Sequence, residues 1–145
     1  MTTTTNAASN YLELKLLQHI FTTSGYTSPN ASLYLALATA VSDAEAGSFT
    51  EANFGAYARV KINGDGSTSP YWTVANDSGT VTAKNTGDIS FPTSTSGSNT
   101  ITHVVLLDHA SNSSNVLFVG DVTDRTVLTG DVFRINSTNL TIELK

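Results

Sequence analysis

Short apolar segments, each bounded by turn residues, fill this sequence from residue 32 onward. They are rich in Val, Ile, Leu, Thr, Tyr and Phe, and Gly, Asn, Ser or Asp stands between most of them. β-branched and aromatic residues in such runs favour extended chain, and many short strands at this spacing are typical of an antiparallel sandwich. We therefore predict a mainly β protein, an antiparallel β-sandwich of jelly-roll type with about eight or nine strands. The predicted strands are residues 32–40, 56–62, 71–75, 79–84, 88–92, 101–109, 115–122, 126–135 and 139–145.

Only residues 10–22 carry the periodicity of a helix. Leu12, Leu16 and Ile20 recur at every fourth position of the stretch NYLELKLLQHIF, which gives an apolar stripe along one side. Asn10 has a side chain that can cap the first turn, and a glycine follows the last turn. We expect one N-terminal amphipathic helix packed on the sandwich. Either this helix or a neighbouring subunit could cover an apolar face of the sheet.

The chain is predicted to form one domain. Its 145 residues suffice for one core, and neither a linker nor an internal repeat divides it. Residues 10–145 are expected to form the sandwich with its helix, and residues 1–9, MTTTTNAAS, an extended polar arm. This start lacks the basic and apolar regions of a signal peptide, so we expect no export by the usual route. The sequence contains no cysteine, which excludes disulfides and thiolate metal sites.

The stretch THVVLLDHASNSSNVLFVGD, residues 102–121, places two histidines and an aspartate among apolar residues, as the flank of a catalytic or metal site does. Side chains alternate along a strand, so Asp108 and His109 would point to opposite faces. His103 and His109 would share a face but lie roughly 20 Å apart, too far for one zinc ion. Apolar residues on both faces and the polar turn at 111–115 instead predict a hairpin whose second face needs a cover.

No catalytic or ion-binding motif is complete. NGDGS at residues 63–67 resembles the start of a calcium loop, but Thr68 stands where that loop needs glycine and Val74 where it needs an acid. The sequence contains no nucleophile elbow, phosphate loop, HExxH zinc motif or dinucleotide fingerprint. We expect no enzymatic activity, no metal and no cofactor.

The charge composition narrows the choice of partners. Seven Lys and Arg stand against twelve Asp and Glu, a formal net charge of −5, without a basic cluster for phosphate binding. No apolar run reaches the roughly eighteen residues of a membrane helix. Neither nucleic acid nor a membrane is therefore expected as a partner. Charged residues make up only 13% of the chain, which favours a part of an assembly, because charges at contacts are costly to desolvate.

Seven elements follow one another in a specific order over residues 9–144. They are SNYLELKLLQHIF, LYLAL, AYARV, ISFPT, ITHVVLLD, LFVGDV and the closing GDVFRI with LTIEL. In this order they resemble a family of small tailed-bacteriophage virion proteins, generally labelled phage tail fibre proteins of a short, single-domain type. The segment at 64–79 looks longer than the family pattern, and the Thr-rich start is distinctive.

The resemblance implies a structural protein of a bacteriophage virion that associates with copies of itself as a homotrimer. A long fibre needs repeats or a shaft, and this chain has neither. We therefore predict a capsid decoration (cement) protein that binds the major capsid protein on the outside of the head and stabilises it. The alternative is a short tail fibre or baseplate protein that binds a glycan receptor of the host.

Two groups of residues are candidates for these contacts. The polar arm contributes almost no apolar surface to a core, so we expect it to contact a capsid surface or a neighbouring subunit through Thr2, Thr3, Thr4 and Thr5. In the long polar loop, a sugar could stack on an aromatic platform formed by Tyr71 and Trp72. Burial of the tryptophan in the core or at an interface is the competing interpretation.

Overall fold

The computed structural model describes residues 7–62, 72–111 and 115–144. It is mainly β, with 46% strand and 10% helix. This confirms the predicted fold class, a β-sandwich-like fold of antiparallel strands with one N-terminal helix. No helix among the described residues is long and apolar enough to cross a membrane.

The elements of the described chain follow in the order β1 (Ala7–Ala8), α1 (Asn10–Phe21), β2 (Tyr34–Asp43), β3 (Ser48–Glu51), β4 (Val60–Lys61), β5 (Trp72–Asp77), β6 (Thr80–Asn85), β7 (Ile89–Ser90), β8 (Asn99–Leu107), β9 (Val116–Val127), β10 (Arg134–Ile135) and β11 (Thr141–Leu144).

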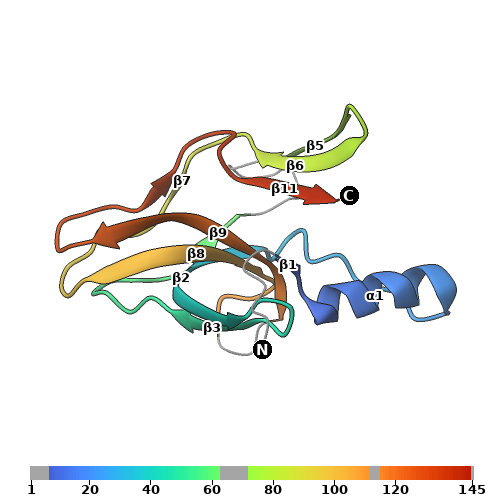
Figure 1. Cartoon of the computed structure of the whole chain (residues 1–145), viewed down its shortest axis with the longest axis horizontal. Helices are drawn as coiled ribbons and strands as arrows, with labels where there is room; N and C mark the ends of the chain where they lie inside the picture. Colours follow the sequence, from blue (N-terminus) through green and yellow to red (C-terminus); the bar gives the residue numbers. More distant parts are fainter. Residues whose placement is uncertain (1–6, 63–71, 112–114, 145) are drawn as a thin grey trace.

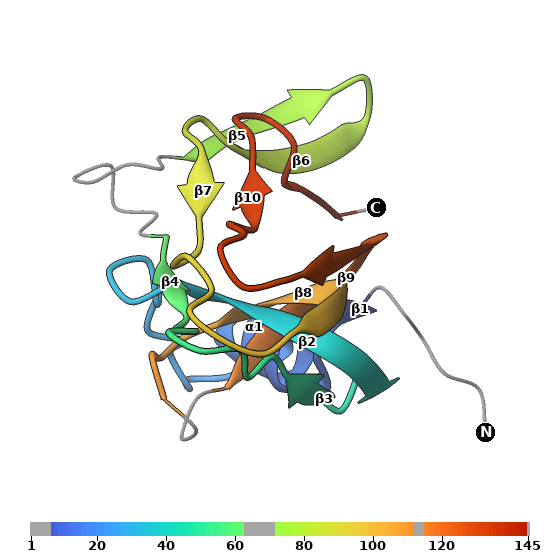
Figure 2. The same cartoon turned by 90° about the vertical axis from the view of Figure 1, so that its left-hand side faces the viewer.

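Two layers of antiparallel strands make up the body (Figure 1). The wide sheet has the strand order β1-β9-β8-β2-β3, and β4 also pairs with β2. Two smaller sheets, β11-β6-β5 and β10-β7, lie over one face of the wide sheet, as the second view also shows (Figure 2). The body is therefore a sandwich in which one wide sheet faces two narrow ones.

β8 lies inside the wide sheet and is buried on both faces. Val104 and Leu106 belong to the cluster between the two layers, whereas Val105 and Leu107 belong to a second cluster. The wide sheet and its turns supply the rest of the second cluster: Ala7, Ala36, Ala38, Val41, Ala44, Phe49, Val116 and Val119. The second face is thus covered largely by side chains of the wide sheet itself.

The two faces of β8 follow the predicted alternation except at Ile101. This side chain joins Val104 and Leu106 between the layers, although its position predicted the face of His103 and Val105. The pairing of β8 with β9 shifts its register between Ile101 and His103. Such an irregularity turns the residues on one side of it to the opposite face of the sheet.

Several strand predictions differ from the structure. Within residues 56–62 only Val60–Lys61 form a strand. Ala56 has a left-handed backbone, with φ of 68°, inside a turn that a hydrogen bond from the Tyr57 N–H to the Phe54 carbonyl (3.0 Å) closes. The predicted strands at 115–122 and 126–135 give one long strand, β9, and the two-residue β10. The sequence did not predict β1 and β3, which are short and owe their order to pairing with β9 and β2.

Ser9 begins the helix and fastens it to the sandwich. Its Oγ accepts a hydrogen bond from the Leu12 N–H (3.2 Å) and donates to the Val116 carbonyl, and its own N–H donates to a second carbonyl of β9 (2.9 Å). The predicted cap, Asn10, is the first helical residue instead, and its N–H donates to the Glu45 carbonyl (2.7 Å). Ser9 is the cap because pairing of β1 with β9 leads it into the extended conformation that a cap requires.

The backbone of Gly55 lies against the segment that follows β7. Its N–H donates to the Ser96 carbonyl (2.8 Å), and the Thr95 N–H donates to the Gly55 carbonyl (3.0 Å). A Cβ on residue 55 would lie 2.3 Å from Ser96 Oγ and 2.8 Å from Ser96 N. Only glycine leaves room for this close approach of two backbone segments.

Gly55→Ala should lower the free energy of unfolding by about 2–3 kcal/mol, because the added methyl group forces the two segments apart. Gly25→Ala is the matched control. Nothing lies within 4 Å of a Cβ at residue 25, so we expect a change below about 0.5 kcal/mol there. Urea denaturation followed by circular dichroism measures both values, and equal effects would contradict the packing described for residue 55.

Candidate interaction surface

α1 projects from one end of the sandwich (Figure 1). Tyr11 and Leu12 in its first turn are partly buried against the core between the layers, and none of its residues is fully buried. The prediction that the helix packs on the sandwich therefore holds only for this first turn, and the helix does not cover a sheet face. The cause is the anchoring of its N-terminal end, since the hydrogen bonds of Ser9 and Asn10 hold that end against β9 and the turn after β2 while the axis leads outward.

The apolar side of α1 faces solvent. The exposed large apolar side chains are Leu14 (55%), Leu16 (46%), Leu17 (56%), Ile20 (61%) and Phe21 (77%). At about 100° per residue, these five spread over about 160° of the helix circumference. Tyr11, Lys15 and Gln18 occupy the opposite arc and are the partly buried positions, together with Leu12. The orientation is the reverse of the usual one, in which the polar side of a surface helix faces water.

The segment after α1 holds the helix in this orientation. Thr22 donates to the Gln18 carbonyl from its hydroxyl (2.6 Å) and from its N–H (3.0 Å), which closes the last turn. The Tyr26 N–H donates to His19 Nδ1 (3.1 Å), and burial raises the pKa of the Tyr26 phenol. The polar side of α1 is thus attached to the returning chain, while the described residues leave the apolar side without a cover.

An apolar groove of about 360 Å³ lies between α1 and the sheet β11-β6-β5. Val74, Val81 and Leu144, which line it, are 68%, 42% and 54% exposed. Leu12 connects the groove with the outward side of α1, because Leu16 lies one turn further along the same stripe. We define the α1 surface as the five exposed apolar side chains of α1 together with Val74, Val81 and Leu144.

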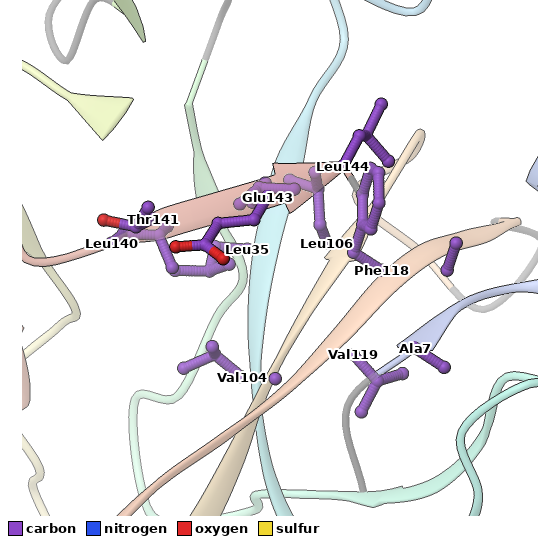
Figure 3. Close-up of a pocket in the computed structure, with 13 residues that line it drawn as sticks. Ala7, Leu35, Val104, Leu106, Phe118, Val119, Leu140, Thr141, Glu143 and Leu144 are labelled. Atoms are coloured by element: carbon purple, nitrogen blue, oxygen red, sulfur yellow. The ribbon is translucent and has the colours of Figure 1, made fainter. Parts of the chain in front are cut away.

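A cavity of about 490 Å³ separates the β11 segment from the wide sheet (Figure 3). Leu140 and the residues of β11 line it on one side, and on the other side lie Ala7, Leu35, Val104, Leu106, Phe118 and Val119. Phe118 and Leu144 line this cavity and the groove alike, so the two spaces adjoin. The layers close tightly at the β7-β10 end, where Phe91 and Phe133 are 3% and 6% exposed, but not beneath β11.

The sequence matches the protein family Gp80, described as podophage GP4 fiber I protein gp80, over residues 7–143. This range takes in β1, α1 and both layers of the sandwich. The chain belongs to this family. It is therefore a structural component of a bacteriophage virion, of fibre type, as the resemblance implied. No curated protein matches the sequence.

The histidines and the aspartate of the central stretch occupy structural positions in this fibre-type protein. The stretch forms the predicted hairpin of β8 and β9. Asp108 accepts hydrogen bonds from the backbone and the side-chain amide of Asn115 (2.7 and 2.9 Å), and His109 Nδ1 accepts one from a backbone N–H of the turn (3.1 Å). His103 Nε2 lies 3.7 Å from Asp121 Oδ1. Among the described residues no group of three or more His, Cys, Asp or Glu could hold a metal ion.

Trp72 is the one predicted contact residue that the structure describes. Thr2, Thr3, Thr4, Thr5 and Tyr71 lie outside the described residues, as does the NGDGS segment at 63–67. Trp72 begins β5, is partly buried against the core, and donates from Nε1 to the Ile62 carbonyl (3.1 Å). The indole thus links the smaller sheet to the end of β4. Its role in a contact with a glycan or a partner stays a prediction.

The α1 surface carried a signal in the sequence that the prediction of a packed helix missed. Leu14, Leu17 and Phe21 repeat at spacings of three and four residues, beside the stripe that contains Leu16 and Ile20. Two such stripes make an apolar arc wider than a helix on the edge of a domain can cover with one contact. The second stripe therefore indicates a second contact.

An ion pair with a buried arginine side chain ties the β8-β9 turn to the wide sheet. Arg59 Nε lies 2.8 Å from Glu51 Oε1, and the Tyr57 hydroxyl donates to the same oxygen (2.7 Å). Arg59 Nη1 also donates to the carbonyls of His109 (3.1 Å) and Ser111 (2.8 Å). Burial by itself would raise the pKa of Glu51, but hydrogen bonds from Arg59 and Tyr57 and the charge of Arg59 hold it below its ordinary value. The Arg59 side chain is only 6% exposed, and this carboxylate places a negative charge directly beside it.

Glu51→Gln should lower the free energy of unfolding by roughly 2–3 kcal/mol near neutral pH, because it removes the carboxylate charge that accepts hydrogen bonds from Arg59 and Tyr57. The pKa of Glu51 is lower in the folded state than in the unfolded chain. Its stabilising contribution is therefore fully present above the unfolded value and is lost as the pH falls through the folded value. The difference between wild type and variant should shrink below about pH 4.

Urea denaturation at about pH 7, 5 and 3 measures this difference. Glu45→Gln is the control, since the Glu45 side chain is exposed, and it should change the free energy of unfolding little at any pH. A stability loss in Glu51→Gln that stays constant over the whole range would contradict the lowered pKa.

Proposed function

We propose that the protein is a subunit of a short fibre on the tail of a bacteriophage, joined to copies of itself and to other virion proteins. Its role is structural and involves no catalysis. The observation that carries the proposal is the extent of the family match, residues 7–143, which takes in the helix and both layers. The whole fold, and not only one part of it, is therefore what this chain shares with the fibre family.

The α1 surface supports attachment within a virion. Soluble monomers rarely expose a contiguous apolar patch of this kind, and such patches mark protein contacts. The patch lies at one end of the longest axis of the molecule, where α1 projects (Figure 1). Attachment through this end would leave the opposite end, where β9 finishes, pointing away from the attached proteins.

Capsid decoration, the role predicted from the sequence, is the second candidate. The compact body favours it, since the described chain folds as one sandwich without a shaft or a structural repeat. Such a body reaches only a short distance from its attachment point. It would suit a seat on the major capsid protein at the outside of the head as well as a short projection from the tail.

The copy number per virion separates these two roles. We expect quantitative mass spectrometry of purified virions, calibrated on the major capsid protein, to find a few copies, and immunogold labelling to place them at the tail. Hundreds of copies spread over the head would reject the tail-fibre proposal and establish decoration. A protein absent from purified virions would reject both.

A further inference from the structure

We propose that the α1 surface is the contact between copies of this chain, in which α1 of each copy packs against α1 and the groove of its neighbours in a homotrimer. The inference concerns the chain itself and does not depend on where the protein sits in the virion. It rests on the fixed orientation of α1, on the apolar area exposed, and on the complementary shapes of helix and groove.

The orientation of α1 is built into the single chain. Ser9 fastens its first turn to β9, and the hydrogen bond between Tyr26 and His19 fastens its polar side to the returning segment. The helix therefore cannot turn its apolar side inward without breaking bonds at both ends. A helix held with Leu17 and Phe21 in water is preorganised for association, because little further ordering is needed when a partner arrives.

The exposed area is large enough for a specific interface. The five apolar residues of α1 expose 46–77% of their surface, which amounts to about 600 Å² for residues of about 200 Å² each. Val74, Val81 and Leu144 add about 300 Å² by the same reckoning. A stable protein interface buries about 800 Å² on each partner. The α1 surface as a whole reaches this size. In a cyclic trimer it is divided between two neighbours, so the residues around it must add to each contact.

Helix and groove of the same chain complement each other. Leu14, Leu17 and Phe21 form a ridge with the alternating three- and four-residue spacing by which helices interlock. The groove of about 360 Å³ is lined mainly by apolar side chains, and an amphipathic helix in an apolar groove is a common mode of recognition. Each copy carries both a ridge and a groove. A contact between the ridge of one copy and the groove of the next, repeated around the assembly, therefore covers both.

The charge distribution permits this contact. The net charge of −5 opposes association of copies in general. On the outward side of α1, however, Glu13 is the one charged side chain, whereas Lys15 lies on the side of the body. The described residues that line the groove include no Asp, Glu, Lys or Arg. Copies that meet through the α1 surface therefore bring few like charges together.

The width of the apolar arc favours three copies over two. In a two-helix contact each helix buries one narrow stripe. The arc of α1 spans about 160° and has two flanks, one on each side of Glu13. A cyclic trimer gives each flank a different neighbour and closes on itself. The flanks are Leu14, Leu17 and Phe21 on one side and Leu16 and Ile20 on the other.

Sedimentation velocity of the full chain at micromolar concentration tests the proposal. Wild type should sediment with three times the 15.3 kDa mass of the chain. Leu17→Glu should sediment as a monomer with an unchanged circular dichroism spectrum, because Leu17 is 56% exposed and lies outside both core clusters. Leu128→Glu is the matched control: Leu128 is 54% exposed and follows the end of β9, far from α1, so this variant should remain a trimer.

A cross-linking experiment gives a second readout, since the chain has no cysteine of its own. Under oxidation, a variant that carries both Leu16→Cys and Phe21→Cys, one on each flank of α1, should form disulfide-linked chains, and Leu128→Cys should not. A monomeric or dimeric wild type would overturn the proposal, and so would a trimer that Leu17→Glu leaves intact. Copy number in the virion tests the proposed function separately, so the failure of one is distinguishable from the failure of the other.

Discussion

The burial of β8 on both faces is the constraint on which the other elements depend. A strand without a solvent face needs two covers, one on each side of its sheet. Val104 and Leu106 meet the second layer on one side, and Val105 packs on the other side against the small side chains Ala36 and Ala38 of β2. Small residues there let the wide sheet cover this face with its own strands and turns. The helix is consequently not needed as a cover for either face.

The position of α1 follows from the same hairpin. β9 is held in place by its long ladder with β8, and the first residues of β9 offer the carbonyl groups to which Ser9 binds. The first turn of the helix is therefore fixed relative to the core, and this also fixes the direction in which the remaining turns extend. Because the bonds at Ser9 and Asn10 engage one end only, the remaining turns extend beyond the sandwich, where no described part of the chain covers their apolar side.

Local patterns in the sequence predicted much of the fold, and long-range geometry accounts for the rest. The hairpin around the 111–115 turn and the helix at 10–22 could be predicted because hydrophobic periodicity and turn residues act within a few positions. Alternation in residues 139–145 likewise predicts Leu140, Ile142 and Leu144 on a core-facing side; the first two are partly buried against the core, whereas Leu144 is 54% exposed. Periodicity fixes an angle around the helix axis but not which angle faces the body, so the outward orientation of α1 could not be predicted. The left-handed backbone at Ala56 likewise has no local signal, since alanine rarely adopts it.

The magnitudes explain why such an exposed helix is tolerable in an assembly but costly in a monomer. Covering about 900 Å² of apolar surface gains on the order of 20 kcal/mol at about 25 cal/mol per Å². Association loses about 4–15 kcal/mol of translational and rotational freedom, and each side chain that becomes ordered costs about 0.5–1.5 kcal/mol more. The balance is therefore favourable only when few charges are desolvated as well. A chain with only 13% charged residues meets this condition, so its low charge and its outward-facing helix are two aspects of one adaptation to close protein contact.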